Sequence, residues 1–384
     1  MSRVGVSQEV FRWAIGRGGA VPARLEKKFP KIREWEAGAS QPTLRQLEDL
    51  ARATRTPLGY FFLDTPPEER LPIPYFRTVT EGPPWHPSPE LLETAHTMQR
   101  RQEWMREYLL DQGVEPLPFI RSARPEEAPR LVAERLRQIV RLEVNWAAAC
   151  PTWEEALRVF RTAVEEAGIL LVGNGVVENN THRRLDPQEF RGFVLVDEIA
   201  PLVFLNTVDA KAAHMFTLAH ELAHLVFGSS AAFDLRSMEP ADEPTERSCN
   251  RVAAEFLVPE DQMRQAWPSL RPDPEPFQTL ARRFKVSPLV AGRRALDLGL
   301  ISREAFFDFY NAYIQYDRRK AASRADGGDF YKSQNLRVGR RFASAVATAL
   351  GEGKLLYSEA YRLTGLRGAA FERYTRAVLT GSSR

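Results

Sequence analysis

The chain has 384 residues, 27% of them charged, and only two cysteines, Cys150 and Cys249, which lie far apart in the sequence. Cysteines so few and so distant exclude a disulfide-built scaffold and fit a reducing cytoplasm. No apolar run reaches the roughly 18 residues of a membrane-spanning helix, and no signal-peptide pattern opens the chain. The sequence therefore predicts a cytoplasmic protein without a membrane partner.

The net charge of +3 is the sum of three very different segments. Residues 1–70 carry 12 basic and 9 acidic side chains, residues 71–276 carry 21 and 32, and residues 277–384 carry 20 and 9, which gives +3, −11 and +11. The basic C-terminal segment suits a polyanionic or acidic-protein partner. It equally suits packing against the acidic middle of the same chain.

Residues 1–65 are predicted to form a domain of short helices, because apolar residues recur at helical spacing from Leu25 to Trp35 and Pro42-Thr43-Leu44 opens a further helix. The sequence W-E-A-G-A-S-Q-P-T-L-R-Q-L-E-D-L-A within it resembles the second half of an XRE-type helix-turn-helix domain. Little more than Pro30 separates Phe29 from the helix of Trp35, where such a domain needs a turn and the start of its recognition helix. Two roles stay open: binding of duplex DNA, or dimerisation and packing, with a homodimer as one form.

A proline-rich connector is predicted over residues 66–90, and a helical connecting region over residues 91–150. The segment Leu71–Thr78 is too apolar for a free linker, so we expect it to lie in a surface groove. A further helix should run from Thr152, its N-cap, to Gly168.

After this helix the pattern changes from helical to strand. Strands are predicted at Ile169–Val172, Phe193–Val196 and Pro201–Asn206, and a loop carrying the surface residue His182 at Asn179–Arg184. The fold class is therefore α+β, with a small sheet in the middle of a helical chain.

The stretch Phe216–Gly228 contains the motif H-E-x-x-H on a predicted helix that ends at the glycine. His220 and His224 lie four residues apart, so they are rotated by only about 40° and face one way. Two such imidazoles can chelate one tetrahedral ion, typically Zn²⁺, and Glu221 can take a proton from activated water. His214 lies six residues earlier and does not share this face.

A second helix, bounded by Pro244 and Pro259, offers the third ligand. Glu246 stands at the head of an inward stripe, so its carboxylate can reach a metal on the neighbouring helix, and Asn250 one turn later can hydrogen-bond around the site. Glu243 competes for the ligand role. Glu255, nine residues after Glu246, is predicted to face solvent.

Residues 277–384 are predicted to form a basic helical domain. Its first part, Leu280–Arg294, has the outline of a second helix-turn-helix, with Lys285-Val286-Ser287 as the turn and Ser287 as the next N-cap. Packing and DNA binding both stay open for this segment. Further helices are expected around Phe342–Leu350 and Tyr357–Leu363.

The combination F-T-L-A-H-E-L-A-H followed by E-x-x-C-N-x-x-A-A-E-F-L-V-P resembles the ImmA/IrrE metallopeptidases, from about residue 153 to residue 259. The resemblance implies a zincin-like peptidase domain, placed here at residues 151–276, of gluzincin type. It makes His220, His224 and Glu246 the zinc ligands and Glu221 the general base. Cys249 stands where the family usually has alanine.

Members of this family cleave a repressor protein or are encoded beside toxin–antitoxin genes. The resemblance thus implies a regulatory zinc endopeptidase whose partner is a protein substrate, a repressor or a toxin. The alternative is an antitoxin-like transcriptional regulator that binds a toxin, operator DNA or both, with peptidase activity secondary or absent.

Overall fold

The computed structural model describes residues 3–17, 22–69, 71, 87–208, 211–229, 231–233, 244–321 and 336–380. These residues form two compact units, residues 3–71 with 87–96 and residues 97–380, and the boundary between them falls inside helix α5 (Pro89–Asp111). Most of the segment expected in a surface groove, Leu71–Thr78, lies outside the described residues. Within the described ranges no helix is long and apolar enough to cross a membrane.

The first unit is a bundle of short helices, as the sequence predicts. Its core includes Phe11, Leu47 and Phe61, each at most 1% exposed. A reciprocal pair of hydrogen bonds between Thr43 and Gln46 caps the helix that begins at Leu44. The pair satisfies backbone N–H donors that the start of a helix leaves unpaired. The elements are α1 (Gln8–Arg17), α2 (Pro22–Lys28), α3 (Ile32–Glu36), α4 (Leu44–Thr54) and the 3₁₀ helix η1 (Leu58–Phe62).

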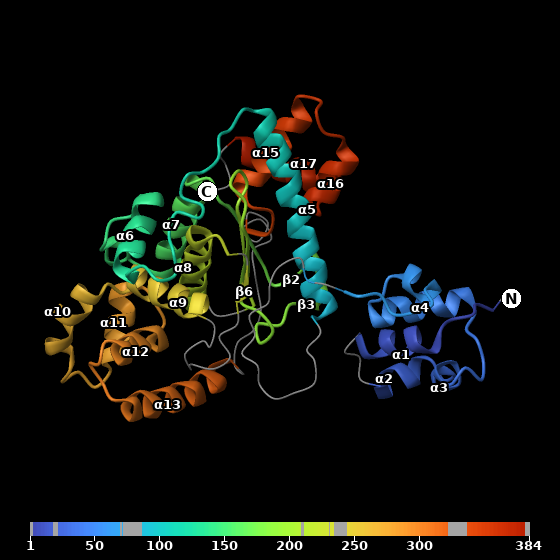
Figure 1. The fold of residues 1–384 in the computed structure, drawn as a ribbon, viewed down its shortest axis with the longest axis horizontal. Helices are drawn as coiled ribbons and strands as arrows, with labels where there is room; N and C mark the ends of the chain where they lie inside the picture. The colour runs from blue at the N-terminus through green and yellow to red at the C-terminus, as the bar shows by residue number, and fades with distance from the viewer. Residues whose placement is uncertain are drawn as a thin grey trace. The chain divides into compact units, whose positions relative to one another are not determined.

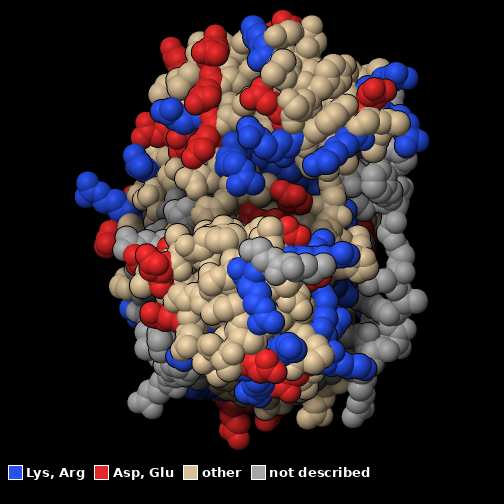
Figure 2. Space-filling view, turned by 90° about the vertical axis from the view of Figure 1, so that its right-hand side faces the viewer, with Lys and Arg blue, Asp and Glu red and all other residues tan. Residues whose placement is uncertain are grey.

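The break that the sequence predicts at Pro30 is present between α2 and α3. A proline cannot continue the hydrogen bonding of the preceding helix, so α2 ends at Lys28, and the five-residue helix α3 begins after the break. That the first unit is of XRE type, and that it binds duplex DNA or a second copy of the chain, remain predictions. Figure 2 shows basic and acidic side chains interspersed over the face that it draws.

The second unit places a small sheet between helices. In Figure 1 its strands lie between α6 to α9 on one side and α5 with α15 to α17 on the other. The helices are α6 (Pro129–Ile139), η2 (Trp146–Ala149), α7 (Trp153–Glu166), α8 (Lys211–Phe227), α9 (Pro244–Leu257), α10 (Glu260–Leu270), α11 (Pro276–Phe284), α12 (Pro288–Asp297), α13 (Arg303–Ala321), α15 (Arg340–Gly351), α16 (Tyr357–Thr364) and α17 (Gly368–Leu379). The strands are β1 (Leu170–Asn174), β2 (Val176–Val177), β3 (Asn180–Arg184), β4 (Gly192–Leu195), β5 (Leu202–Asn206) and β6 (Ala231–Phe233).

The main sheet has the strand order β1-β5-β4-β6, in which only the pair β1 and β5 is parallel. Every residue of β1, β4 and β5 is buried, which requires cover on both faces of the sheet. The three predicted strands are confirmed, and the α+β class with them. The predicted N-cap of α7 is also confirmed, since the Thr152 hydroxyl accepts a hydrogen bond from the backbone N–H of Glu155 at 3.1 Å.

The predicted loop at Asn179–Arg184 is wrong. Residues 180–184 form β3, which pairs antiparallel with the two-residue strand β2. The strand is polar and largely exposed, so it has no apolar alternation from which the sequence could reveal it. His182 is exposed there, as expected.

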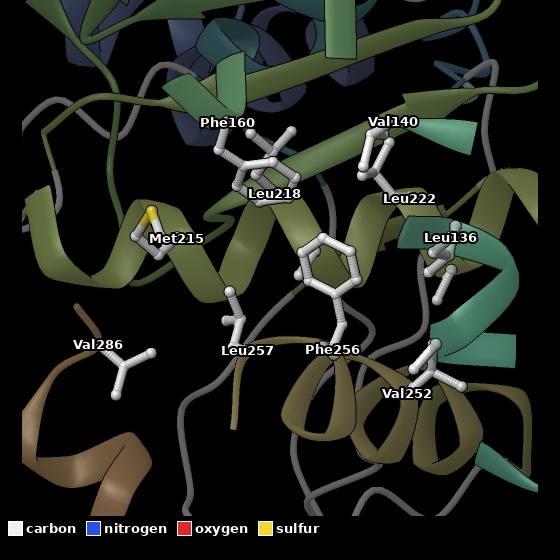
Figure 3. Close-up of a cluster of buried hydrophobic side chains, with 14 of the residues drawn as sticks. Leu136, Val140, Phe160, Met215, Leu218, Leu222, Val252, Phe256, Leu257 and Val286 are labelled. Atoms are coloured by element: carbon white, nitrogen blue, oxygen red, sulfur yellow. The ribbon is translucent and has the colours of Figure 1, made fainter. Parts of the chain in front are cut away.

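The apolar core holds α8 against α9. Phe256 of α9 points toward α8, where Leu218 and Leu222 belong to the same core, as Figure 3 shows. Its ring stacks on Phe160 of α7, with the ring centroids 5.2 Å apart. Ala253 is fully buried in the same core and lets the two helices approach closely. The helix with H-E-x-x-H and the helix with Glu246 are therefore fixed side by side.

The predicted turn between α11 and α12 is confirmed. Lys285 adopts the left-handed conformation at the end of α11, and the Ser287 hydroxyl accepts a hydrogen bond from the backbone N–H of Val290 at 3.2 Å. Phe284, Val286 and Ala291 belong to the same core as α8 and α9. This observation favours the packing role of α11 and α12 that the sequence left open beside DNA binding.

Candidate metal centre

Helix α8 presents H-E-x-x-H to the protein interior. His220, Glu221 and His224 are completely buried. The helix ends at Gly228, which has φ +75 and donates its backbone N–H to the carbonyl of His224 at 2.8 Å. Glycine is favoured in this left-handed position because it lacks a Cβ.

Three side chains converge at this point from α8 and α9. The Nε2 atoms of His220 and His224 are 3.0 Å apart. The carboxylate of Glu246 lies 3.2 Å from Nε2 of His220 and 3.1 Å from Nε2 of His224. Ligand atoms around one tetrahedral zinc ion are separated by about 3.3 Å, so the triangle has nearly the size of a zinc site.

The second nitrogen of each imidazole is engaged elsewhere. Nδ1 of His220 lies 3.1 Å from Oδ1 of Asn250, and Nδ1 of His224 lies 2.9 Å from the Ser229 hydroxyl. With Oδ1 of Asn250 as the acceptor, the proton of His220 lies on Nδ1 and a lone pair remains on Nε2. The nitrogen that faces Glu246 is thus an electron-pair donor.

Burial sets the electrostatics of the site. Burial lowers the pKa of His220, which keeps the imidazole neutral and able to offer its lone pair. Burial alone would raise the pKa of Glu246, but the adjacent His220 and His224 hold it below its usual value, so the carboxylate is ionised. A divalent cation among the three groups would compensate the charge of the buried carboxylate.

Glu221 lies beside this triangle with neither carboxylate oxygen hydrogen-bonded to any described residue. Burial, and then the charge of Glu246, raises the pKa of Glu221 well above its usual value. The group is therefore a buried, orphaned acid–base residue next to three converging ligand atoms. These observations fit a bound metal ion, because two imidazoles and a carboxylate are a donor set that zinc takes.

Gly192 on β4 makes the room that Glu221 occupies. A methyl group at its Cα would lie 2.8 Å from Cγ2 of Thr217, 2.9 Å from the carbonyl oxygen of Phe204 and 3.0 Å from Oε1 of Glu221. No pattern in the sequence indicates this role, because only the fold brings β4 against α8.

We expect Gly192→Ala to lower the free energy of unfolding by about 1–3 kcal/mol, since the backbone carbonyl of Phe204 cannot yield and the added methyl overpacks the site. Urea denaturation measures this loss. The matched control is Gly351→Ala at the end of α15, where an added Cβ meets nothing within 4 Å, and stability should stay constant or rise by up to about 1 kcal/mol. Equal stability of the two variants would contradict the close approach of β4 to Glu221.

Other residues singled out in the sequence lie elsewhere. His214 is buried on α8 and does not belong to the group of close metal-ligating side chains that the described residues form, which is His220, His224 and Cys249. His182 lies on β3. Glu243, the competitor for the ligand role, lies outside the described residues. Two partners were missed: Ser229, just after the glycine that ends α8, and Cys249, whose Sγ and one ring nitrogen of each histidine all lie within 4.8 Å of one another.

The expected exposure of Glu255 is wrong. It is 7% exposed, forms an ion pair with Arg294 of α12 and accepts on its backbone carbonyl a hydrogen bond from Arg137 of α6. The face of α9 opposite the histidines is covered by two further helices, so α9 is buried on both sides. The contact with Arg294 also joins the basic C-terminal segment to the acidic middle of the chain.

The comparisons with known proteins agree with this part of the fold. Residues 164–296 match the model of a peptidase family described as the IrrE N-terminal-like domain, and residues 338–377 match a family described only as a domain of unknown function. The first match runs from the end of α7 to α12 and contains the whole candidate metal centre, so it supports the ImmA/IrrE resemblance and a metallopeptidase-like domain. No curated protein and no solved structure matches the chain.

Proposed function

We propose that the protein is a zinc-dependent endopeptidase that cleaves a specific intracellular protein, such as a repressor. The observation that carries this proposal is the buried triangle of His220, His224 and Glu246, with ligand atoms 3.0–3.2 Å apart. Such a set of electron-pair donors is stable in a protein interior when a cation lies among them.

In this proposal His220, His224 and Glu246 hold the zinc ion. Asn250 and Ser229 fix the ring orientations of the two histidines through their Nδ1 atoms, a support on which metal affinity depends. A bound zinc ion supplies Lewis acidity toward water and the scissile carbonyl.

Glu221 is the proposed acid–base residue. Its carboxylate accepts a proton from the attacking water and later donates it to the departing amine. Burial, and then the charge of Glu246, raises the pKa of Glu221, so its carboxylate is a stronger base toward water than an exposed glutamate.

The main sheet offers a place where an extended protein substrate could bind. β6 is an outer strand of the main sheet, directly follows α8 in the chain and pairs with β4 beside Gly192. An extended peptide binds such an outer strand through its main chain and leaves its side chains free to set specificity.

Removal of the metal tests the proposal. The purified protein should contain about one zinc ion per chain. Added to an extract of the producing cells, it should create new protein N-termini in one or a few proteins, measured by N-terminal labelling and mass spectrometry. These termini should disappear after dialysis against a chelator and return with Zn²⁺, whereas cleavage that persists in chelator would exclude a metallopeptidase.

A further inference from the structure

Cys249 lies at the candidate metal centre, on the helix that carries Glu246. It is fully buried, and its Sγ and one ring nitrogen each of His220 and His224 all lie within 4.8 Å of one another. Residues three apart on a helix are neighbours on its surface, so Glu246 and Cys249 approach the two histidines from adjacent positions of α9.

The second cysteine of the chain has a different environment. Cys150 follows η2, and its thiol donates a hydrogen bond to the carbonyl of Trp146 at 3.7 Å. It is not among the mutually close metal-ligating groups that the described residues form. The chain thus offers one cysteine at the site and one away from it.

We propose that Cys249 is a fourth protein ligand of the metal ion, beside His220, His224 and Glu246. This inference rests on the proposed function of the site. Zinc–nitrogen and zinc–sulfur bonds of about 2.0 and 2.3 Å place tetrahedrally arranged nitrogen and sulfur atoms about 3.6 Å apart. Because the sulfur lies within 4.8 Å of these nitrogens, it reaches this distance through a shift of at most about 1.2 Å, and its proton passes to solvent as the sulfur binds.

A fourth protein ligand changes the state of the peptidase. Four-coordinate zinc sites with four protein ligands are closed, whereas catalytic sites keep one position for water or substrate. With the sulfur bound, the site is latent, and a substrate has to displace the thiolate before Glu221 can act. Glu221, whose carboxylate oxygens have no hydrogen-bond partner among the described residues, is in place for that open state.

Cobalt substitution of the full chain tests the ligand directly, because a cobalt–thiolate bond gives a charge-transfer absorption band in the near ultraviolet that nitrogen and oxygen ligands do not give. The metal-free protein is titrated with Co²⁺ alone. We expect the band at one Co²⁺ per chain in the wild type and in Cys150→Ala, and its loss in Cys249→Ala and Cys249→Ser. Loss of the sulfur should weaken Co²⁺ binding by at least about 10- to 100-fold, the range found when groups supporting a ligand are removed.

The outcomes separate this inference from the proposed function. One bound Co²⁺ without the band in the wild type excludes Cys249 as a ligand and leaves the peptidase proposal intact. No Co²⁺ binding at all removes both. A band that survives in the two Cys249 variants, or disappears in Cys150→Ala, also overturns the inference. At saturating zinc, Cys249→Ala should cleave the substrate faster than the wild type, because no thiolate has to be displaced, and an equal or slower rate with full metal content would contradict the latent state.

Discussion

Glu221→Gln should abolish proteolysis while leaving the metal in place. Loss of a positioned general base costs about 100- to 10,000-fold in rate, enough to remove the new N-termini from a cell extract. Glutamine has the shape of glutamate, so the completely buried position stays filled. The metal should remain, because the carboxylate of Glu221 is not part of the triangle formed by His220, His224 and Glu246.

Two measurements on the same preparation decide this prediction: zinc content by elemental analysis and cleavage by N-terminal labelling. Glu198→Gln is the matched control, since this glutamate is half exposed and pairs with Arg121 at the surface of the same unit. It should retain wild-type cleavage. Wild-type cleavage by Glu221→Gln would remove Glu221 from the mechanism and favour a regulator that acts by binding its partner. Loss of zinc together with cleavage would assign Glu221 a structural role instead.

The part of the site that the sequence predicts depends on helical geometry. Four residues separate His220 from His224 and Glu246 from Asn250, and a helix places each pair on one face whatever surrounds it. Apolar positions on the same helices predict which faces meet, so the side-by-side packing of α8 and α9 follows from local periodicity.

The remaining partners of the site depend on tertiary structure. Gly192 reaches Glu221 only because β4 packs against α8, and no spacing in the sequence relates the two residues. Glu255 is buried because α6 and α12 cover the outer face of α9, which its helical position cannot reveal. Cys249 lies three residues after Glu246, a spacing that places the two side chains side by side on a helix and thus indicates a place at the site. Its small side chain favoured instead the interpretation of Cys249 as a replacement for alanine.

The fold shows the same division. Strands β1, β4 and β5 carry continuous apolar runs and are predicted from the sequence, since strands buried on both faces require them. β3 is stabilised by pairing with a two-residue partner while its side chains face solvent, so polarity suggested a loop. In the first unit Pro30 is a local signal in the sequence, and it predicts the break between α2 and α3.

Glu246→Ala should lose most of the bound zinc. The carboxylate lies within 3.2 Å of both imidazoles, at the separation of ligands around one zinc ion, so its removal should weaken binding strongly. We expect the affinity for zinc to fall by at least about 100-fold. Removal of a group that only supports a metal ligand already lowers the affinity by up to about 100-fold. Elemental analysis should then find far less than one zinc ion per chain after gel filtration.

The same variant should lose the stabilisation that the metal gives the folded protein. At a zinc concentration of 100 times the dissociation constant, binding adds about 2.7 kcal/mol to the free energy of unfolding, and a 100-fold weaker site adds only about 0.4 kcal/mol at that concentration. Thermal denaturation with and without Zn²⁺ measures this difference, and it does not depend on knowing the substrate. Glu243→Ala is the control, because Glu243 competes in the sequence for the ligand role and should keep both the metal and the zinc-dependent stabilisation. Equal losses in the two variants would contradict the assignment of Glu246, and a loss confined to Glu243→Ala would transfer the ligand role to that residue.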